Sequence, residues 1–297
     1  MRRKRDNNKS GKNLFLKIVF KLIIAFLIIS FLLFLLFFIN SIFLRNNQAA
    51  VIFFDVGQGD AILLRNINGK NILIDGGPDN LILKKLGKFL PYFSKHLDLV
   101  ILSHSHDDHL GGLLEVFRRY QVDYLLLGKN LESSHLQDLL LDIIYDNNNL
   151  RNSQQKKTEV VYIEQQKELS LNECNLMFFN PLVLKVPDND NNSLITKLTC
   201  PDWQFLFAGD NEVRVEQALL QSGLDLSVNV FKASHHGSKT SNIKEFLEAL
   251  APSFFIVSVG GNNRFGHPAL EVLERVKDLG INIKRTDYVG DIIFLLD

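Results

Sequence analysis

From Ala50 onward, short runs of β-branched or aromatic residues alternate with longer stretches in which apolar residues recur at helical spacing. The expected strands are 51–56, 61–65, 71–75, 97–103, 123–127, 159–163, 194–199, 204–209, 228–234, 254–259 and 291–296. The expected helices are 110–120, 133–146, 211–222, 242–250 and 268–279. Two polar stretches, 146–157 and 187–193, are expected to form surface loops. Many strands with interleaved helices predict an α/β fold in which helices cover the outer faces of sheets.

The first 48 residues do not follow this pattern. Residues 22–39 are uncharged and almost entirely apolar, and as a helix they would span about 27 Å, close to the ~30 Å hydrocarbon core of a membrane. A cleaved signal peptide is the alternative, but its apolar region would be shorter, and no clear A-x-A site follows. We therefore expect a basic cytoplasmic tail over 1–21, a transmembrane anchor over 22–44 and one folded domain over 49–297.

Charge is divided unevenly along the chain. Nine of the 33 basic residues but only one of the 33 acidic residues lie within 1–48, so the remainder carries a formal charge of −8. The basic residues precede the apolar segment, which places the N-terminus in the cytoplasm and the domain outside the cell. The acidic domain argues against a broad nucleic-acid-binding surface, although bound divalent cations would offset part of its charge.

The two cysteines, Cys174 and Cys200, are too few for a disulfide scaffold or a thiolate metal site. They are compatible with one disulfide in an oxidising compartment. They are equally compatible with two separate buried thiols.

Candidate chemistry is concentrated in residues 97–113, LDLVILSHSHDDHLGGL, where an apolar strand is expected to end at Ser103. Four potential ligands follow within six residues: His104, His106, Asp108 and His109. Imidazole and carboxylate together suit zinc or manganese. One short loop cannot wrap a single ion with all four groups, so the spacing predicts two adjacent divalent ions that activate a shared water. A solvated histidine-rich loop is the less favoured alternative.

HSHDDH fits the H-x-H-x-D-H signature of the metallo-β-lactamase superfamily, and other segments resemble that family in the expected order. They are FFDVGQGDAILL (53–64), NILIDGG (71–77), FLFAGD (205–210), VFKASHHGS (230–238) and NNRFGHP (262–268). Together they resemble more narrowly the hydrolase domain of ComEC-type late-competence DNA-uptake channels. The resemblance covers about 50–297 and implies an αββα four-layer sandwich, here expected as a hydrolase domain behind one transmembrane helix.

The resemblance also implies a ligand set. His104 and His106 would hold the first ion, and Asp108, His109 and His235 the second, with Asp210 bridging both. Asp75 would hydrogen-bond a ligand histidine and fix its tautomer. For Asp55 and Asp60 we expect structural roles, and His236 is the weaker candidate beside His235.

One departure from the family affects the first ion, because no histidine lies between His135 and His235. Asn191, Asn192 and Ser193 stand in that region, and an oxygen-rich site would shift the metal preference towards manganese. We take Asn192 as a candidate ligand contact. Ser238 is a second such candidate, although its hydroxyl could equally shape the local turn.

The sequence leaves the substrate open. By resemblance, the first hypothesis is an extracellular phosphodiesterase or nuclease acting on DNA, with Asp108 orienting the attacking water and His267 serving as leaving-group acid or phosphate contact. The second is hydrolysis of another phosphodiester or ester, such as a cell-wall polymer or small metabolite, which the acidic domain slightly favours. The third is a non-catalytic surface binding protein. Expected partners are DNA, the membrane and other competence proteins.

Overall fold

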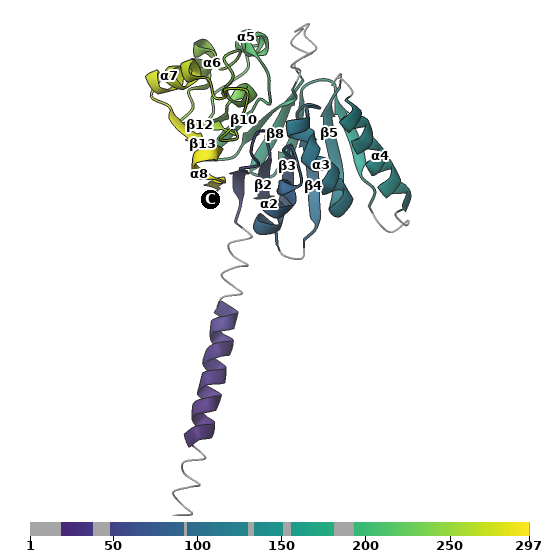
Figure 1. The fold of residues 1–297 in the computed structure, drawn as a ribbon, viewed down its shortest axis with the longest axis vertical. Coiled ribbons are helices and arrows are strands. Elements are labelled where there is room, and N and C mark those ends of the chain that lie inside the picture. The colour runs from purple at the N-terminus through teal and green to yellow at the C-terminus, as the bar shows by residue number, and fades with distance from the viewer. Residues whose placement is uncertain are drawn as a thin grey trace, which may run out of the picture. The chain divides into compact units, whose positions relative to one another are not determined.

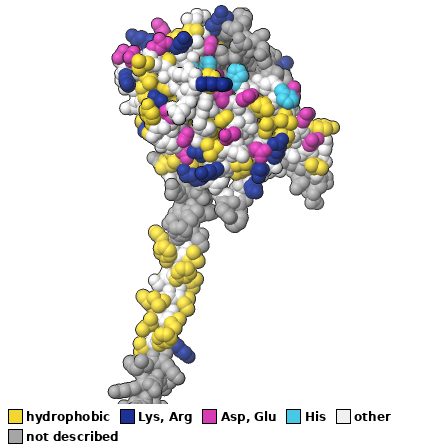
Figure 2. Space-filling view, viewed as in Figure 1, with side chains coloured by type: hydrophobic (Ala, Val, Ile, Leu, Met, Phe, Trp, Pro, Cys, Tyr) yellow, Lys and Arg dark blue, Asp and Glu magenta, His cyan; other side chains and the backbone are white. Residues whose placement is uncertain are grey.

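The computed structural model describes residues 19–37, 48–91, 94–129, 134–150, 156–180 and 193–296. The chain divides into two units, Met1–Asn47 and Gln48–Asp297. In the first unit, the 19-residue helix Val19–Phe37 is long and apolar enough to cross a membrane, and its side chains are exposed hydrophobics (Figure 2). This helix overlaps the anchor expected over 22–44, of which 38–44 lie outside the described residues.

The second unit contains two seven-stranded mixed sheets (Figure 1). The first sheet consists, in spatial order, of β14 (Ile292–Leu295), β1 (Ala50–Phe53), β2 (Ile62–Ile67), β3 (Lys70–Ile74), β4 (His96–Leu102), β5 (Gln121–Gly128) and β6 (Glu159–Ile163). The second sheet consists of β13 (Asn282–Arg285), β12 (Phe254–Val257), β11 (Val230–Lys232), β10 (Gln204–Phe207), β9 (Ile195–Thr199), β8 (Cys174–Phe179) and β7 (Lys167–Leu171).

Helices cover the outer face of each sheet. Those on the first sheet are α2 (Leu81–Phe89), α3 (Asp107–Arg119) and α4 (His135–Leu150). Those on the second sheet are α5 (Val213–Gln221), α6 (Lys244–Leu250) and α7 (Leu270–Asp278), and the short α8 (Thr286–Val289) leads into β14. The predicted four-layer αββα sandwich is therefore confirmed.

The domain has three apolar layers, one between the two sheets and one beneath the helices of each sheet. Side chains that alternate along the strands form them. In β1, Val51 and Phe53 pack between the two sheets, whereas Ala50 and Ile52 pack beneath the helices of the first sheet. Successive strand residues point to opposite faces, so a strand buried on both sides is apolar throughout. This explains why the continuous apolar runs of the sequence form strands.

The structure corrects one expectation, the loop over 146–157, and decides another, the state of the two cysteines. The polar stretch 146–157 was expected to be a loop, but α4 continues to Leu150, and the Asn147 side chain donates to the Phe117 carbonyl oxygen while the Asn148 side chain pairs with the Thr158 backbone. Cys174 and Cys200 form a disulfide that links the start of β8 to the residue after β9.

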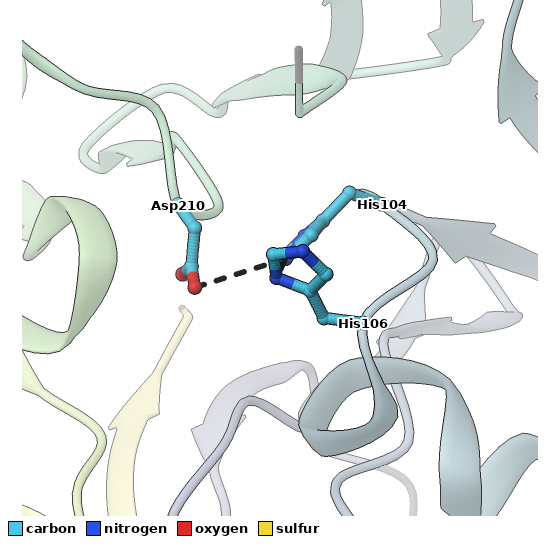
Figure 3. A group of neighbouring side chains, drawn as sticks. All are labelled: His104, His106 and Asp210. Carbon is cyan, nitrogen blue, oxygen red and sulfur yellow. Dashed lines mark hydrogen bonds and ion pairs between the residues drawn. The ribbon is translucent and has the colours of Figure 1, made fainter. Parts of the chain in front are cut away.

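Parallel pairing determines where functional loops meet. Strands β3 to β6 run parallel in the first sheet, and β10 to β13 run parallel in the second. Loops at the carboxyl ends of parallel strands lie along one edge of a sheet, where layered α/β folds place their ligands. The loops after β4 and β10 thereby face one another across the sandwich (Figure 3).

Candidate metal centre

The loop after β4 carries most of the predicted ligands. His106 is the N-cap residue of α3, and Asp107 and Asp108 occupy its first turn. Carboxylates are favoured there by the unpaired N–H groups and the dipole of the helix. The helix start therefore turns Asp108 and His109 towards the centre while His104 and His106 remain in the loop before it.

A first group of ligand atoms consists of His104, His106 and Asp210, all within 4.8 Å of one another (Figure 3). His104 Nε2 lies 3.0 Å from His106 Nδ1 and 3.7 Å from Asp210 Oδ2. Because two ring nitrogens and a carboxylate oxygen converge on one point, this group can hold a divalent cation.

A second group consists of Asp108, His109 and His236. His236 Nε2 lies 3.3 Å from Asp108 Oδ2, and His109 Nε2 lies 3.9 Å from Asp108 Oδ1. Asp210 Oδ2 is 3.4 Å from His109 Nε2 and 3.5 Å from His236 Nε2. One carboxylate oxygen of Asp210 thus borders both groups, as a bridging ligand must.

The outer nitrogen of each buried histidine is engaged. His109 Nδ1 lies 2.8 Å from Asp75 Oδ2, and Asp75 in turn accepts hydrogen bonds from the Ser103 backbone N–H and hydroxyl. His236 Nδ1 donates to the Ser258 carbonyl oxygen at 2.9 Å. These contacts fix the tautomer that leaves each Nε2 lone pair pointing inward, the arrangement found around histidine metal ligands.

The two inward nitrogens test whether a cation fits. Among the described residues, neither His109 Nε2 nor His236 Nε2 has a hydrogen-bond partner, although both rings are buried. A buried polar atom without a partner carries a desolvation cost of about 1–3 kcal/mol. A divalent cation would use both lone pairs, so the donor set fits a metal centre.

The electrostatic environment of the two histidines also favours a bound cation. Burial lowers the pKa of His236, but the carboxylates of Asp210, Asp60 and Asp108 together outweigh burial and raise that pKa to about 9. The pKa of His109 is likewise raised well above its usual value, against burial, by Asp210 and Asp75. Both shifts report a strongly negative potential at the position where the ligand atoms converge, and this potential attracts cations.

A buried ion pair lies behind the centre. Lys232 at the end of β11 is fully buried and pairs with Asp60 from the loop between β1 and β2. Burial lowers the pKa of Lys232, but Asp60 and Asp210 raise it above the usual value. The Asp60 backbone N–H also donates to the Asp108 carbonyl oxygen at 3.2 Å. Asp60 therefore has the structural role expected for it, connecting the ligand loop to the second sheet.

The sequence reasoning missed Lys232. The available signal was a lysine in the otherwise apolar run that immediately precedes the SHHG segment. A charged residue inside a buried strand requires a partner of opposite charge.

His235 and His236 differ from expectation. The chain enters a short turn, Ser234–Gly237, in which both histidines have positive φ, 48° and 53°. His236 points into the ligand group, whereas His235 is 28% exposed and has Nδ1 3.4 Å from Glu212 Oε1. His235 Nε2 is 3.8 Å from Asp210 Oδ2, but His235 belongs to none of the ligand groups among the described residues. The position that the sequence assigned to His235 is taken by His236.

Asn192 and Ser238 were the two candidate ligand contacts outside the ligand loop. Asn192 lies outside the described residues. Its neighbour Ser193 is described, and its hydroxyl accepts the Asp210 backbone N–H at 3.0 Å. Ser238 shares a 2.9 Å hydrogen bond with Thr240 inside the turn, which supports the turn-shaping alternative. The Asp55 carboxylate accepts the Gly57 backbone N–H at 3.4 Å within the loop after β1, which supports the structural role expected for it.

His267 lies at the edge of the centre, with its ring centroid 5.3 Å from that of His235. Burial and the neighbouring His235 and His236 lower the pKa of His267 to about 4. The ring is therefore neutral near pH 7, which favours the phosphate contact over the leaving-group acid among the two roles expected for it. Its Nδ1 is buried and has no hydrogen-bond partner among the described residues.

The chain is similar to curated competence proteins. The chain is 28% identical over 267 residues to ComE operon protein 3 of Bacillus subtilis (strain 168), covering 83% of this chain and 33% of that protein. It is 27% identical over 253 residues to competence protein ComA of Neisseria gonorrhoeae, covering 84% of this chain and 32% of that protein. The chain thus spans about a third of the length of these curated relatives.

A solved structure and a family profile match the fold of the domain. The structure of YhfI, a metallo-beta-lactamase fold protein from Bacillus subtilis, superposes with a TM-score of 0.54 at 11% identity, over 83% of this chain and 99% of that one. The family profile described as "Metallo-beta-lactamase superfamily" matches residues 54–261, a range that includes the ligand loop, Asp210 and His236. The chain belongs to the metallo-β-lactamase superfamily.

Proposed function

We propose that the protein is a membrane-anchored, two-metal phosphodiesterase that cleaves DNA. The observation that carries this proposal is the pair of ligand groups that share Asp210 Oδ2. Similarity to two competence proteins supports DNA as the substrate. The ligands we propose are His104, His106 and Asp210 for one ion, and Asp108, His109, His236 and Asp210 for the other.

Ions bound there would polarise the phosphoryl group and lower the pKa of a water molecule. The protein's own contribution is to orient the reactants. Burial raises the pKa of Asp108, but the neighbouring imidazoles of His236 and His109 outweigh burial and lower it well below the usual value. Asp108 is thus a carboxylate at any working pH and accepts a hydrogen bond from the attacking water.

His267 would act on the other side of the reaction. A neutral imidazole cannot deliver a proton as readily as an imidazolium, but its N–H donates a hydrogen bond. We assign His267 to hydrogen bonding with a phosphate oxygen or the leaving oxygen, where negative charge develops. This replaces the role of a neutral-pH acid that the sequence suggested.

The metal is zinc or manganese in this proposal. The first group has two nitrogens and one carboxylate, and the described residues add no further imidazole there. Imidazole-rich sites suit zinc, whereas oxygen donors and water favour manganese. Comparison of the two metals in the assay below distinguishes them.

The domain is proposed to lie outside the cell. The basic residues before the helix favour a cytoplasmic N-terminus. The Cys174–Cys200 disulfide supports an oxidising location, because cytosolic thiols are usually kept reduced. Protease added to intact cells should remove the domain, and full protection would contradict this orientation. Contact with other competence proteins is a further proposal that rests on similarity alone.

A second candidate, hydrolysis of another phosphodiester or ester, is favoured by the formal charge of −8 over residues 49–297. The deciding experiment incubates the detergent-solubilised full-length protein, loaded with manganese or zinc, with single-stranded DNA and with bis-p-nitrophenyl phosphate. Cleavage of both supports the nuclease. Turnover of the small phosphodiester alone would favour the second candidate, and metal uptake without turnover would indicate a binding protein.

A further inference from the structure

One large aromatic side chain beside the candidate metal centre is exposed to solvent. Phe265 is 55% exposed at the tip of the loop between β12 and α7. Its ring lies 6.0 Å from the His267 ring at an interplanar angle of 25°, a stacked arrangement. The Arg264 guanidinium carbon lies 5.3 Å from the centroid of the Phe265 ring.

The loop that presents Phe265 is held in shape. The Asn263 side-chain amide donates to the carbonyl oxygens of Gly260 and His267, at 2.8 and 2.7 Å. Its carbonyl oxygen accepts the His267 backbone N–H at 3.0 Å. One side chain therefore ties both ends of the loop and fixes the exposed ring on a defined base, which lowers the entropic cost of binding a ligand.

His267 stacks against Phe265, and the 55% of the Phe265 side chain that is exposed is available for a planar partner. His267 in turn lies next to His235 and His236, with ring centroids 5.3 and 6.3 Å away. The aromatic pair thus forms a continuous path from the metal ligands to solvent. A polymer whose phosphate occupies the centre would bring an adjacent ring system onto this path.

We propose that Phe265, with Arg264 beside it, forms a stacking subsite for a nucleobase of a single-stranded nucleic acid whose phosphate lies at the metal centre. This inference rests on the proposed function and narrows its substrate to strands with unpaired bases. Bases stack on exposed aromatic rings whatever their identity, and arginine adds a cation–π contribution. In a duplex the base faces are already stacked, so the subsite discriminates against double-stranded DNA.

The negative charge of the domain increases the share of nucleic-acid affinity that stacking must supply. A domain of formal charge −8 lacks the broad basic surface on which most nucleic-acid-binding proteins rely, and Figure 2 shows basic and acidic side chains intermixed over one face. Stacking does not depend on neutralising phosphates. Phe265 accordingly supplies affinity that survives at high salt.

The test measures binding by the full-length protein in detergent, in an Asp108→Asn background that blocks cleavage. Probes are fluorescein-labelled oligothymidylate and an abasic oligomer of the same length. Phe265→Ala should weaken oligothymidylate binding about 5- to 100-fold and leave binding of the abasic oligomer unchanged. Phe265→Trp should retain the preference for bases, and Phe265→Leu should lose it.

Tyr145 on α4 is the matched control, because it is a similarly exposed aromatic residue, at 68% exposure, on another element. Tyr145→Ala should change neither probe. Equal affinities of wild type and Phe265→Ala for oligothymidylate, or equal losses on both probes, would overturn the stacking subsite. Phe265-dependent binding in a protein that never cleaves DNA would instead leave the subsite standing and remove the proposed nuclease.

Discussion

His236 donates its Nδ1 hydrogen to the Ser258 carbonyl oxygen at 2.9 Å. A carbonyl oxygen can only accept, so the Nδ1 hydrogen lies in this contact, and His236 Nε2 faces Asp108 and Asp210, where a cation held by these carboxylates would accept its lone pair. Among the described residues, the His235 ring makes no comparable contact with a backbone carbonyl; its Nδ1 lies 3.4 Å from Glu212 Oε1. Two adjacent histidines are thereby given different chemical roles.

The first prediction separates these histidines by metal content. His236→Ala should lose about one metal equivalent per chain, because it removes a ligand from the second group. His235→Ala should retain both equivalents. Elemental analysis after gel filtration in metal-free buffer measures the difference, and the reverse pattern would return the ligand role to His235.

The second prediction concerns Asp108. Asp108→Ala should abolish hydrolysis, with loss of at least about 10³-fold in turnover, while the far-ultraviolet circular dichroism spectrum stays unchanged. The residue sits in the first turn of α3 and is 28% exposed at its side chain, so no apolar core depends on it. Near-normal turnover in this variant would rule out its assignment as ligand and water-orienting group.

The third prediction concerns His267. His267→Ala should lower turnover of DNA by about 10²-fold with metal content unchanged. Because its pKa is lowered to about 4, the ring stays neutral between pH 6 and 8 and should add no limb to the pH–rate profile in that range. His267→Gln, which keeps an N–H donor, should recover part of the loss.

Two controls decide what His267 does. The defect should be smaller on bis-p-nitrophenyl phosphate, whose leaving group is already good. A pH–rate limb near neutrality that disappears in His267→Gln would show that the residue acts as an acid after all. Loss of a metal equivalent would show that it is a ligand.

The fourth prediction concerns Glu216, a buried carboxyl on α5 that accepts the backbone N–H groups of Asn242 and Ile243 at 2.7 and 3.0 Å. Burial raises its pKa to about 7, and these hydrogen bonds offset only part of that effect. The folded state therefore holds a proton between pH 4.5 and 7 that the unfolded state releases. Its contribution to stability is present below pH 4.5 and is lost as the pH rises to 7.

The loss amounts to at most about 3 kcal/mol. Urea unfolding of residues 48–297 at pH 5 and pH 8 should show it as a fall in the free energy of unfolding. Glu216→Gln cannot titrate, so the fall should shrink in that variant even if the variant is less stable at both values. An identical fall in both proteins would assign the pH dependence to other groups.

The fifth prediction concerns the disulfide, which joins cysteines 26 residues apart. Closing a loop of that length restricts the unfolded chain and should stabilise the domain by about 3 kcal/mol. The Cys174→Ser/Cys200→Ser double variant should lose that amount in urea unfolding, and a reducing agent should affect only the wild type. Equal stability of the two proteins without reductant would contradict this contribution.

The apolar runs predicted sheets covered by helices, and strands such as β4 and β5 could be located from those runs alone; the four-layer sandwich was implied by the resemblance to the metallo-β-lactamase superfamily. The sequence reasoning missed β7, β8, β13, α2 and the short α8. Of the three strands, β7 and β13 lie at sheet edges and expose polar side chains such as Glu168 and Lys284, so neither shows a buried apolar run. In α2, only Ile82, Leu86 and Phe89 are buried among lysines and a glycine, which makes its helical pattern short.

The ligand loop could be located because its four ligands are adjacent in sequence. The choice between His235 and His236 could not, because it depends on the left-handed backbone of one turn. Lys232 and Phe265 were missed for a related reason. Their roles depend on what lies across the sandwich or beside the loop, and neighbours in sequence do not reveal this.

The pairing of β14 with β1 has a consequence for biosynthesis. Ala50 lies opposite Leu295 and Phe53 opposite Ile292, so strands from the two ends of the domain are neighbours in the first sheet. That sheet carries the ligand loop after β4, and its order is complete only when residue 295 has joined it. In the proposed orientation, with the N-terminus held by the membrane and the domain outside the cell, the nascent domain would thus stay open during synthesis and export, and hydrolytic competence would begin only after the last strand has crossed.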